Sequence, residues 1–348
     1  MHALREKGIV TALGAALLFG AGTPFAKMLL DTAEPWLLAG LLYAGSGLGL
    51  LLYRRVARAP RVTLTRKDGL WLGAAIVCGG MIGPALLMLG LSGMPATGAS
   101  LLLNAEGVFT ALLAWFAFKE NFDRRIALGM ALIVAGAVVL GWPGEASFGA
   151  ALPALAVLGA CFAWGLDNNF TRKVALNDAT FIAMAKGLVA GATNIALAML
   201  MGSKFPMVAT IAGAALLGFL SYGVSLVLFV LALRELGTAR TGAYFSTAPF
   251  AGAVLAIALL GEPITVQLVM AGALMAAGVW LHLTEHHEHS HGHATQSHEH
   301  EHEHDAHHQH PHDPPAEPGE RHSHAHTHSP LKHAHPHYPD SHHRHEHL

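Results

Sequence analysis

The chain has 348 residues and a formal net charge of −2; 53% of its residues are hydrophobic and only 13% are charged, against ~25% charged residues in ordinary soluble proteins. This composition excludes a soluble globular domain and indicates a membrane protein with many spans. No phosphate-binding glycine loop, nucleophile motif or zinc-hydrolase spacing occurs. We therefore expect no enzyme, no cofactor, no ATP-driven step and no nucleic-acid partner.

Ten apolar runs follow one another along the chain, and each approaches the roughly 20 residues that a helix needs to cross a bilayer. The first run is long for the apolar region of a signal peptide and matches a later segment, so we interpret it as a retained helix. The sequence predicts an all-α integral membrane fold with transmembrane helices at 8–30, 35–53, 69–91, 96–118, 126–142, 148–166, 180–201, 205–233, 241–261 and 263–283.

The positions of lysine and arginine predict the orientation. With the N-terminus inside, 15 basic residues fall on the inner side, and Lys27 and Lys204 fall on the outer side. This bias predicts a multi-pass protein of the bacterial inner membrane with both termini in the cytoplasm. The lipid bilayer is its first partner, and a homodimer is a further possibility that the sequence leaves open.

The two halves of the membrane region resemble each other. At an offset of 142 residues, Glu120 aligns with Glu262 and Gly136 with Gly278. At an offset of 145, Gly20, Phe25 and Lys27 of the first run align with Gly165, Phe170 and Arg172, at and just beyond the end of the sixth run. Because each half has five helices, the halves must lie in opposite orientations, and such inverted repeats are typical of secondary transporters.

Two segments carry a family resemblance. Residues 106–120 (EGVFTALLAWFAFKE) and 248–262 (APFAGAVLAIALLGE) resemble the paired signatures of the ten-helix drug/metabolite transporter superfamily of EamA type. The resemblance implies repeats at residues 1–143 and 144–284, followed by a tail at 285–348, and a family that exports amino acids, drugs, sugars and metals. Gly107 stands where the second half has Pro249, so we expect the fourth helix to be straighter than the ninth.

Polar residues inside a membrane are costly and are therefore functional candidates. Glu106 is the strongest, as a cation ligand or proton-exchanging group; the alternative is a protonated carboxyl that only packs. Asn104 lies nearby, with an interhelical hydrogen bond equally plausible. The cluster Asp167, Asn168 and Asn169 is expected to end the sixth helix, either as oxygen ligands at a cytoplasmic entry or as a helix cap.

Other polar residues favour structural roles. Lys186 is predicted to pair with Asp167, which would neutralise both charges. Lys27 is expected to reach the membrane interface, as long basic side chains do near helix ends. Glu120 and Glu262 are expected to cap the helices that follow them. Weaker cavity candidates are Asn194, Tyr222 and Ser246.

The last 63 residues contain 24 of the 26 histidines. Alternating histidines suit Ni²⁺, Co²⁺ and Zn²⁺, and many prolines with few aliphatic residues predict a disordered tail. The tail also resembles those of nickel and cobalt efflux members of the family. The predicted metal-binding histidines are His298, His300, His302, His304, His322, His324, His326 and His328.

The sequence favours a secondary exporter of a divalent transition metal, nickel or cobalt before zinc, that exchanges metal for protons. In this hypothesis the tail collects metal and Glu106 ligates it or couples it to protons, with help from Asn104 and the cluster at 167–169. The main alternative is an exporter of amino acids or related metabolites whose tail buffers or senses metal. A membrane-anchored metal sensor and a tail without a metal role are further alternatives.

Overall fold

The computed structural model describes residues 2–118, 124–141, 148–174, 177–236, 241, 244–283, 288–293, 296–302, 322–328 and 331–336. Residues 1–285 form one compact unit and residues 286–348 form another.

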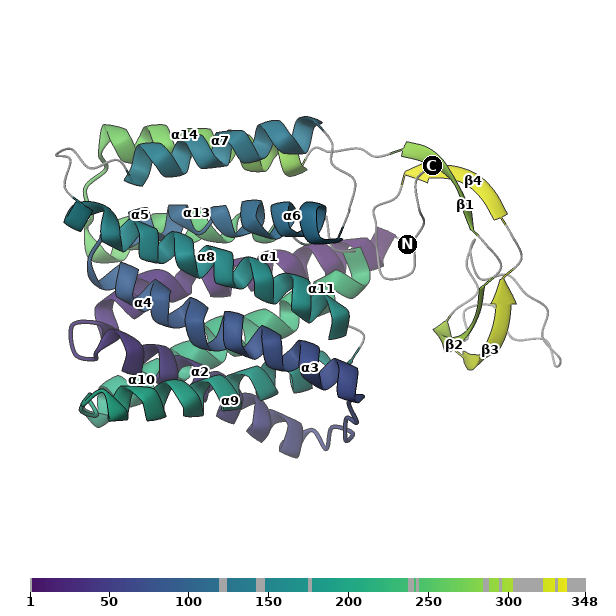
Figure 1. Cartoon of the computed structure of the whole chain (residues 1–348), viewed down its shortest axis with the longest axis horizontal. Coiled ribbons are helices and arrows are strands. Elements are labelled where there is room, and N and C mark those ends of the chain that lie inside the picture. The colour runs from purple at the N-terminus through teal and green to yellow at the C-terminus, as the bar shows by residue number, and fades with distance from the viewer. Residues whose placement is uncertain are drawn as a thin grey trace. The chain divides into compact units, whose positions relative to one another are not determined.

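The first unit is a bundle of helices that run side by side (Figure 1). The first half of the chain contributes α1 (His2–Leu29), α2 (Pro35–Val56), α3 (Arg66–Ala75), the π-helix η1 (Ile76–Ile82), α4 (Gly83–Ser92), α5 (Ala96–Leu102), α6 (Ala105–Phe118) and α7 (Arg124–Gly141). The second half contributes α8 (Phe148–Val174), α9 (Ala179–Leu200), α10 (Val208–Gly218), the π-helix η2 (Phe219–Val224), α11 (Ser225–Leu236), α13 (Ala248–Leu260) and α14 (Val266–Leu283).

These helices agree with the predicted spans. Among the described residues, seven helical stretches are long and apolar enough to cross a membrane, and three shorter apolar helices lie at Ala127–Leu140, Ala248–Leu260 and Val266–Leu281. Each of the ten predicted spans overlaps one of them. The all-α membrane fold is thus confirmed.

The halves are joined by close helix pairs at opposite edges of the bundle, α7 beside α14 and α2 beside α9 (Figure 1). Glycines allow the second pair to touch: a Cβ on Gly47 would lie 2.3 Å from the backbone nitrogen of Leu188, and one on Gly187 would lie 2.4 Å from that of Gly47. Small residues at such contacts are how membrane helices gain packing energy.

Both halves interrupt the same two helices. The third helix of each half contains a π-helical segment, η1 and η2, and their first residues are 143 positions apart (219 − 76). The fourth helix of each half is broken by a turn, at residues 103–104 and at residues 246–247. The inverted repeat is thus visible in backbone irregularities as well as in sequence.

The expectation that the fourth helix is the straighter one is wrong. The break at residues 103–104 lies before Gly107, so it forms without a proline. Asn104 supports it, because its side-chain amide donates to the carbonyl of Leu101 (3.0 Å) and so competes with the helical bonds, as short amide side chains do. In the second half, Pro249 stands in the first turn of α13, where proline is tolerated.

Parts of the tail are described as backbone. Its described residues form four short strands in two antiparallel pairs, β1 (Glu288–His293) with β4 (Leu331–Pro336) and β2 (Gln296–His302) with β3 (His322–His328). The alternation of histidine with other residues has the two-residue period of a strand.

Candidate functional site

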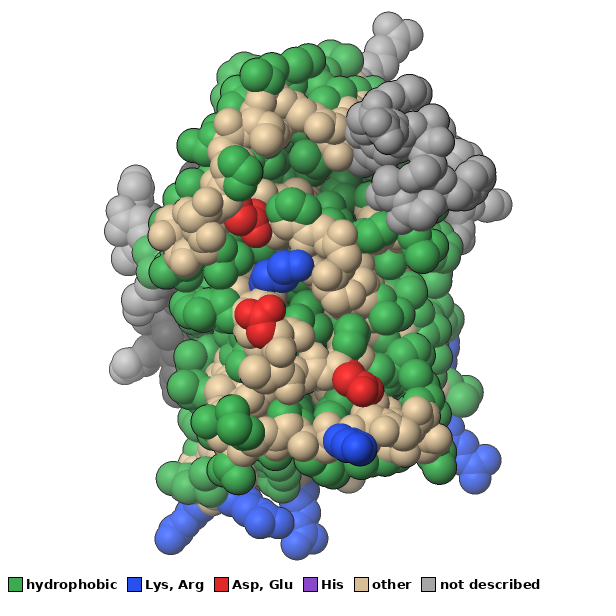
Figure 2. Space-filling model, turned by 90° about the vertical axis from the view of Figure 1, so that its left-hand side faces the viewer, with side chains coloured by type: hydrophobic (Ala, Val, Ile, Leu, Met, Phe, Trp, Pro, Cys, Tyr) green, Lys and Arg blue, Asp and Glu red, His purple; other side chains and the backbone are tan. Residues whose placement is uncertain are grey.

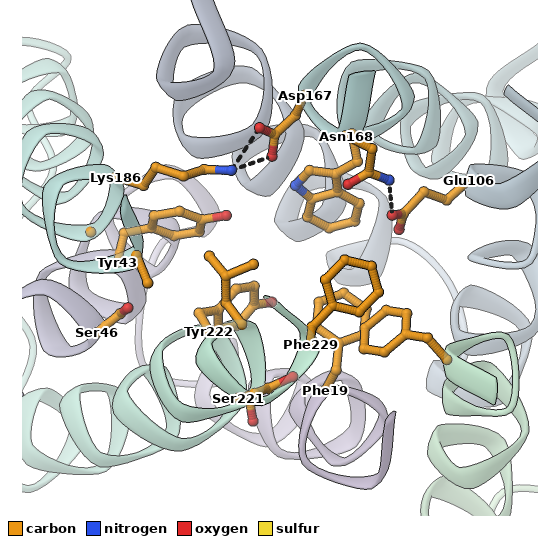
Figure 3. Close-up of a pocket in the computed structure, with 16 residues that line it drawn as sticks. Phe19, Tyr43, Ser46, Glu106, Asp167, Asn168, Lys186, Ser221, Tyr222 and Phe229 are labelled. Atoms are coloured by element: carbon orange, nitrogen blue, oxygen red, sulfur yellow. Dashed lines mark hydrogen bonds and ion pairs between the residues drawn. The ribbon is translucent and has the colours of Figure 1, made fainter. Parts of the chain in front are cut away.

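A cavity lies between the two halves of the bundle, near the middle of the helices. It contains about 620 Å³ of empty space, part of it open to the surroundings. Its wall combines three charged side chains, several hydroxyl groups and a set of aromatic rings (Figure 3). The residues that carry the argument are Phe19, Tyr43, Ser46, Glu106, Trp164, Asp167, Asn168, Lys186, Ser221, Tyr222, Ser225, Phe229 and Phe245.

One side of the wall holds an ion pair between α8 and α9. The ammonium of Lys186 lies 2.6 Å from both carboxylate oxygens of Asp167 and 3.3 Å from the hydroxyl of Thr171. That hydroxyl in turn donates to Asp167 (2.8 Å). The side chains of Lys186 and Asp167 are only 5% and 8% exposed. The predicted pairing of these two residues is present, and it leaves this side of the cavity electrically neutral.

The π-helix η1 shapes the space around this pair. A Cβ on Gly79 would lie 1.9 Å from a carboxylate oxygen of Asp167, so only glycine leaves room for the carboxylate. The carbonyl of Gly79 accepts hydrogen bonds from the hydroxyl of Tyr43 (2.7 Å) and the indole N–H of Trp164 (2.9 Å). A π-helical turn shifts the backbone hydrogen-bond pattern and is often found at functional sites.

Glu106 occupies another part of the wall, in the first turn of α6. Its carboxylate accepts a hydrogen bond from the side-chain amide of Asn168 (2.8 Å), which also donates to the hydroxyl of Thr110 (3.2 Å). No cationic side chain among the described residues pairs with Glu106. It therefore differs from Asp167, whose charge Lys186 compensates.

Aromatic rings form the side of the cavity that faces these polar groups (Figure 3). Phe19 lies at the centre of this aromatic cluster, with its ring 6.0 Å from that of Trp164, 5.9 Å from that of Tyr222 and 5.3 Å from that of Phe245. Phe245 is also in edge contact with Phe229 at 4.8 Å. These separations are typical of favourable ring pairs.

The structure places the predicted site residues in two groups. Glu106, Asp167, Asn168 and Lys186 line the cavity. Asn104 is buried at the helix break, and Asn169 is buried with its amide on the carbonyls of Gly165 (2.8 Å) and Thr110 (3.2 Å).

The prediction that residues 167–169 end or cap the sixth helix is wrong, because α8 continues to Val174. Among the weaker candidates, Tyr222 lines the cavity, whereas Asn194 donates to the carbonyl of Gly80 (3.0 Å). The aromatic cluster was not predicted. Phenylalanines are as common on lipid-facing surfaces as in cavities, so the sequence offers no signal for them.

Lys27 and Glu262 both bond to the chain around the turn before α5. Lys27 donates to the carbonyls of Leu91 (2.6 Å) and Met94 (2.9 Å), so it bonds to the neighbouring chain turn. Glu262 accepts from the backbone N–H groups of Ala96 (2.7 Å) and Thr97 (2.8 Å). It therefore caps α5 of the other repeat and not the helix that follows it; Glu120 lies outside the described residues.

These contacts fasten the turn before α5 at the end of the bundle shown in Figure 2, where few charged side chains stand among hydrophobic ones. The cation lies at the C-terminal end of α4 and the anion at the N-terminal end of α5, as the two helix dipoles favour.

At the opposite end of the bundle, Arg54 at the end of α2 connects this helix to the start of α9. Its guanidinium donates to Asp178 (2.7 Å), to Thr180 and to the carbonyl of Pro60 (2.7 Å). Burial alone would raise the pKa of Asp178, but hydrogen bonds from Thr180, from the N–H of Phe181 and from Arg54 outweigh it and hold the pKa of that carboxyl below its ordinary value.

Metal ligands are a separate question. Among the residues that the structure describes, no group of three or more His, Cys, Asp or Glu side chains could hold a metal ion. This statement does not cover the predicted metal ligands of the tail. His304 lies outside the described residues. His298, His300, His302, His322, His324, His326 and His328 are described only as backbone of β2 and β3.

Comparison with known proteins now identifies the relatives of this arrangement. The profile of the EamA-like transporter family matches residues 6–142 and 151–284. A transporter from Methanothermobacter thermautotrophicus, named as uncharacterized, is 28% identical over 294 residues, which cover 79% of this chain and 85% of that protein.

Two further comparisons agree. A "Probable amino-acid metabolite efflux pump" of Salmonella typhimurium is 28% identical over 300 residues, covering 80% of this chain and 95% of that protein. One solved protein structure aligns with a TM-score of 0.62 at 17% identity, covering 79% of this chain and 94% of the other. At that identity the likeness shows the fold alone.

Proposed function

The chain belongs to the EamA-like transporter family, and on that premise we propose that it exports a small organic amino compound through the cavity between its repeats. The observation that carries the proposal is that Glu106, a carboxylate with no cationic partner among the described residues, shares the cavity with an aromatic wall. Inside a membrane protein such a carboxylate is costly unless it is protonated or binds a cation. A substrate ammonium group supplies that cation.

The chemistry of the wall supports an amine over a transition metal. Ni²⁺, Co²⁺ and Zn²⁺ favour imidazole and thiolate ligands, and none of the described residues that line the cavity is histidine or cysteine. Among the described residues that line the cavity, Glu106 is the one carboxylate without an ion pair. Aromatic rings, in contrast, attract organic cations through their faces and accommodate an apolar body.

The transport cycle is proposed to be alternating access driven by proton exchange. Asp167 and Lys186 each lie seven residues, about two turns, from the ends of α8 and α9 at Val174 and Ala179. With both termini in the cytoplasm of a bacterium, as proposed from the charge bias, this end faces the cytoplasm and favours loading from there. Glu106 would bind either a proton or the substrate ammonium, so entry of one requires release of the other.

Replacement of Glu106 by glutamine tests the proposal. Reconstituted protein should lose at least about 99% of its exchange of a radiolabelled amino compound, since a charge-assisted bond in a site of low dielectric is worth several kcal/mol. Glu34→Gln is the matched control, because Glu34 is an exposed carboxylate bonded to Ser203 at one end of the bundle. Equal activity of Glu106→Gln and the control would remove Glu106 from the mechanism.

Export of a divalent metal is a second candidate, and the histidine-rich tail favours it. The two candidates are separated by deleting residues 286–348 and measuring both fluxes. If metal is the substrate and the tail collects it, Ni²⁺ or Co²⁺ flux and cellular tolerance fall on deletion. If the cavity serves an amino compound, flux of that compound is unchanged, because residues 1–285 form a compact unit of their own.

A further inference from the structure

The two charged groups that could bind a ligand differ in their hydrogen bonds: the donors of Lys186 are taken up by the protein, whereas the acceptor capacity of Glu106 is not. On the donor side, the ammonium of Lys186 has three N–H groups, and three protein oxygens lie within bonding distance: both carboxylate oxygens of Asp167 at 2.6 Å and the hydroxyl of Thr171 at 3.3 Å. Lys186 is the one cation among the described residues that line the cavity, and it therefore has no donor left for a ligand.

Four other donor groups in the wall are directed to the protein, whereas the uncharged hydroxyls of Ser46, Ser221 and Tyr222 also line the cavity. The hydroxyl of Tyr43 and the indole of Trp164 both donate to the carbonyl of Gly79. Ser225 donates to the carbonyl of Ala15 (2.8 Å). The amide of Asn168 donates to Glu106 and Thr110.

Acceptor capacity, by comparison, is available. Among the described residues, Asn168 is the one side chain that hydrogen-bonds to Glu106, and it bonds to a single carboxylate oxygen. A carboxylate accepts about four hydrogen bonds. Glu106 can therefore receive the N–H groups of an ammonium ligand, while the aromatic cluster around Phe19 lies across the cavity (Figure 3).

The charge balance leads to the same ligand. Asp167 and Lys186 cancel, so the cavity is left with the negative charge of Glu106. A free amino acid would bring a carboxylate that finds no available cation, and burying an unpaired carboxylate costs several kcal/mol.

We propose that the cavity selects organic ammonium compounds with an apolar or aromatic body and no free carboxylate, and that Asp167 sets this selectivity by occupying Lys186. This inference rests on the proposed function and narrows it from amino compounds in general to amines. It separates this chain from a pump for free amino acids. Asp167 acts as a specificity-determining residue through its contact with Lys186.

Two matched ligand pairs that differ only by a carboxylate test the inference on the full-length protein in lipid nanodiscs. Isothermal titration calorimetry would compare 2-phenylethylamine with phenylalanine and tryptamine with tryptophan. Each amine is expected to bind at least about tenfold more tightly than its amino acid, a difference of 1.4 kcal/mol. Equal or tighter binding of the amino acids, or no binding of any of the four compounds, overturns the inference.

The variant Asp167→Asn provides the second arm. It keeps the size of the side chain but releases Lys186 for a ligand carboxylate, so the preference for the amine should fall at least about tenfold or reverse. An unchanged preference in the folded variant would remove Asp167 as the determinant. If the variant does not fold, the comparison of amines with amino acids on the unchanged protein still tests the preference for amines.

The outcome also separates this inference from the proposed function. Tight, Glu106-dependent binding of the amino acids would overturn the selectivity and leave export of an amino compound standing. Exchange activity that is unaffected by Glu106→Gln would contradict the proposed function whatever the ligand preference.

Discussion

The two repeats share the same interruptions of their helices, but the charged residues of the cavity are not repeated. Both carry a π-helical segment in the third helix and a break in the fourth, at equivalent positions. The charged residues of the cavity have no such counterparts: Glu106 aligns with Ala248 at the offset of 142, and Asp167 aligns with Gly22 at the offset of 145. A duplicated scaffold supplies the irregular helices, and a single copy of each charged side chain makes the site asymmetric.

This difference separates two kinds of constraint. Interrupted helices at the middle of a membrane protein provide a place where repeats can move and where polar groups are tolerated. Such positions are needed in both repeats. Substrate recognition, in contrast, needs one carboxylate and one aromatic wall on facing sides of one cavity.

Among the charged residues that are not repeated, loss of Lys186 should have the largest effect on the stability of the protein. Lys186→Ala leaves the carboxylate of Asp167 buried without a cation, and breaking a buried pair in this way costs about 3–5 kcal/mol. We expect a large fall in the thermal stability of the purified protein. Replacing both partners, Asp167→Asn with Lys186→Met, should recover most of it. A stable Lys186→Ala protein would show that the pair is not needed for the fold.

Substitutions in the two π-helical segments should have effects of intermediate size on stability. Gly79→Ala in η1 places a methyl group 1.9 Å from Asp167 and should destabilise the protein by about 1–3 kcal/mol, as overpacking does. Gly223→Ala in η2 meets the hydroxyl of Ser46 at 3.2 Å and should cost less.

Gly73→Ala is the matched control for Gly79→Ala on the same transmembrane segment. No atom lies within 4 Å of its added methyl group, so the change should be neutral or stabilising by up to ~1 kcal/mol. Melting temperatures of the three variants in one detergent would check the order. Equal effects at positions 79 and 223 would mean that the two segments are as alike in packing as they are in backbone.

The smallest expected effect is at Asp178, outside the cavity. Because its folded pKa lies below the ordinary value of 3.8, its stabilising contribution is present above that pH and is lost as the pH falls through the lowered folded value. Asp178→Asn should lower the melting temperature by only about 3 °C near neutral pH. Below pH 3.8 the gap between variant and parent should close; a gap that widens with falling pH would contradict the lowered pKa.

The sequence predicts most of the fold and part of the site. Apolar runs of membrane-spanning length and the repeated glutamates identify the bundle, because both follow from the solvent properties of the bilayer. Glu106, Asp167 and Lys186 are likewise visible as charges where charge is costly. Asp167 was misplaced at a helix end, since local composition does not reveal that α8 extends to Val174.

The remaining site residues could not be predicted for physical reasons. Phe19 and Phe229 belong to the cavity only because distant helices bring them together, and an apolar residue gives no cost signal inside a membrane. The role of Gly79 depends on a tertiary contact with Asp167 and on a π-helical turn that no residue pattern announces.

The central claim is that the chemistry of export resides in residues 1–285 and is directed to an amino compound bound at Glu106. The most direct measurement is exchange by the protein truncated after Glu285, reconstituted in liposomes and offered a panel of labelled amino compounds and, separately, Ni²⁺. The account predicts Glu106-dependent exchange of at least one amino compound and no Ni²⁺ flux. Glu106-dependent Ni²⁺ flux without exchange of any amino compound would contradict it.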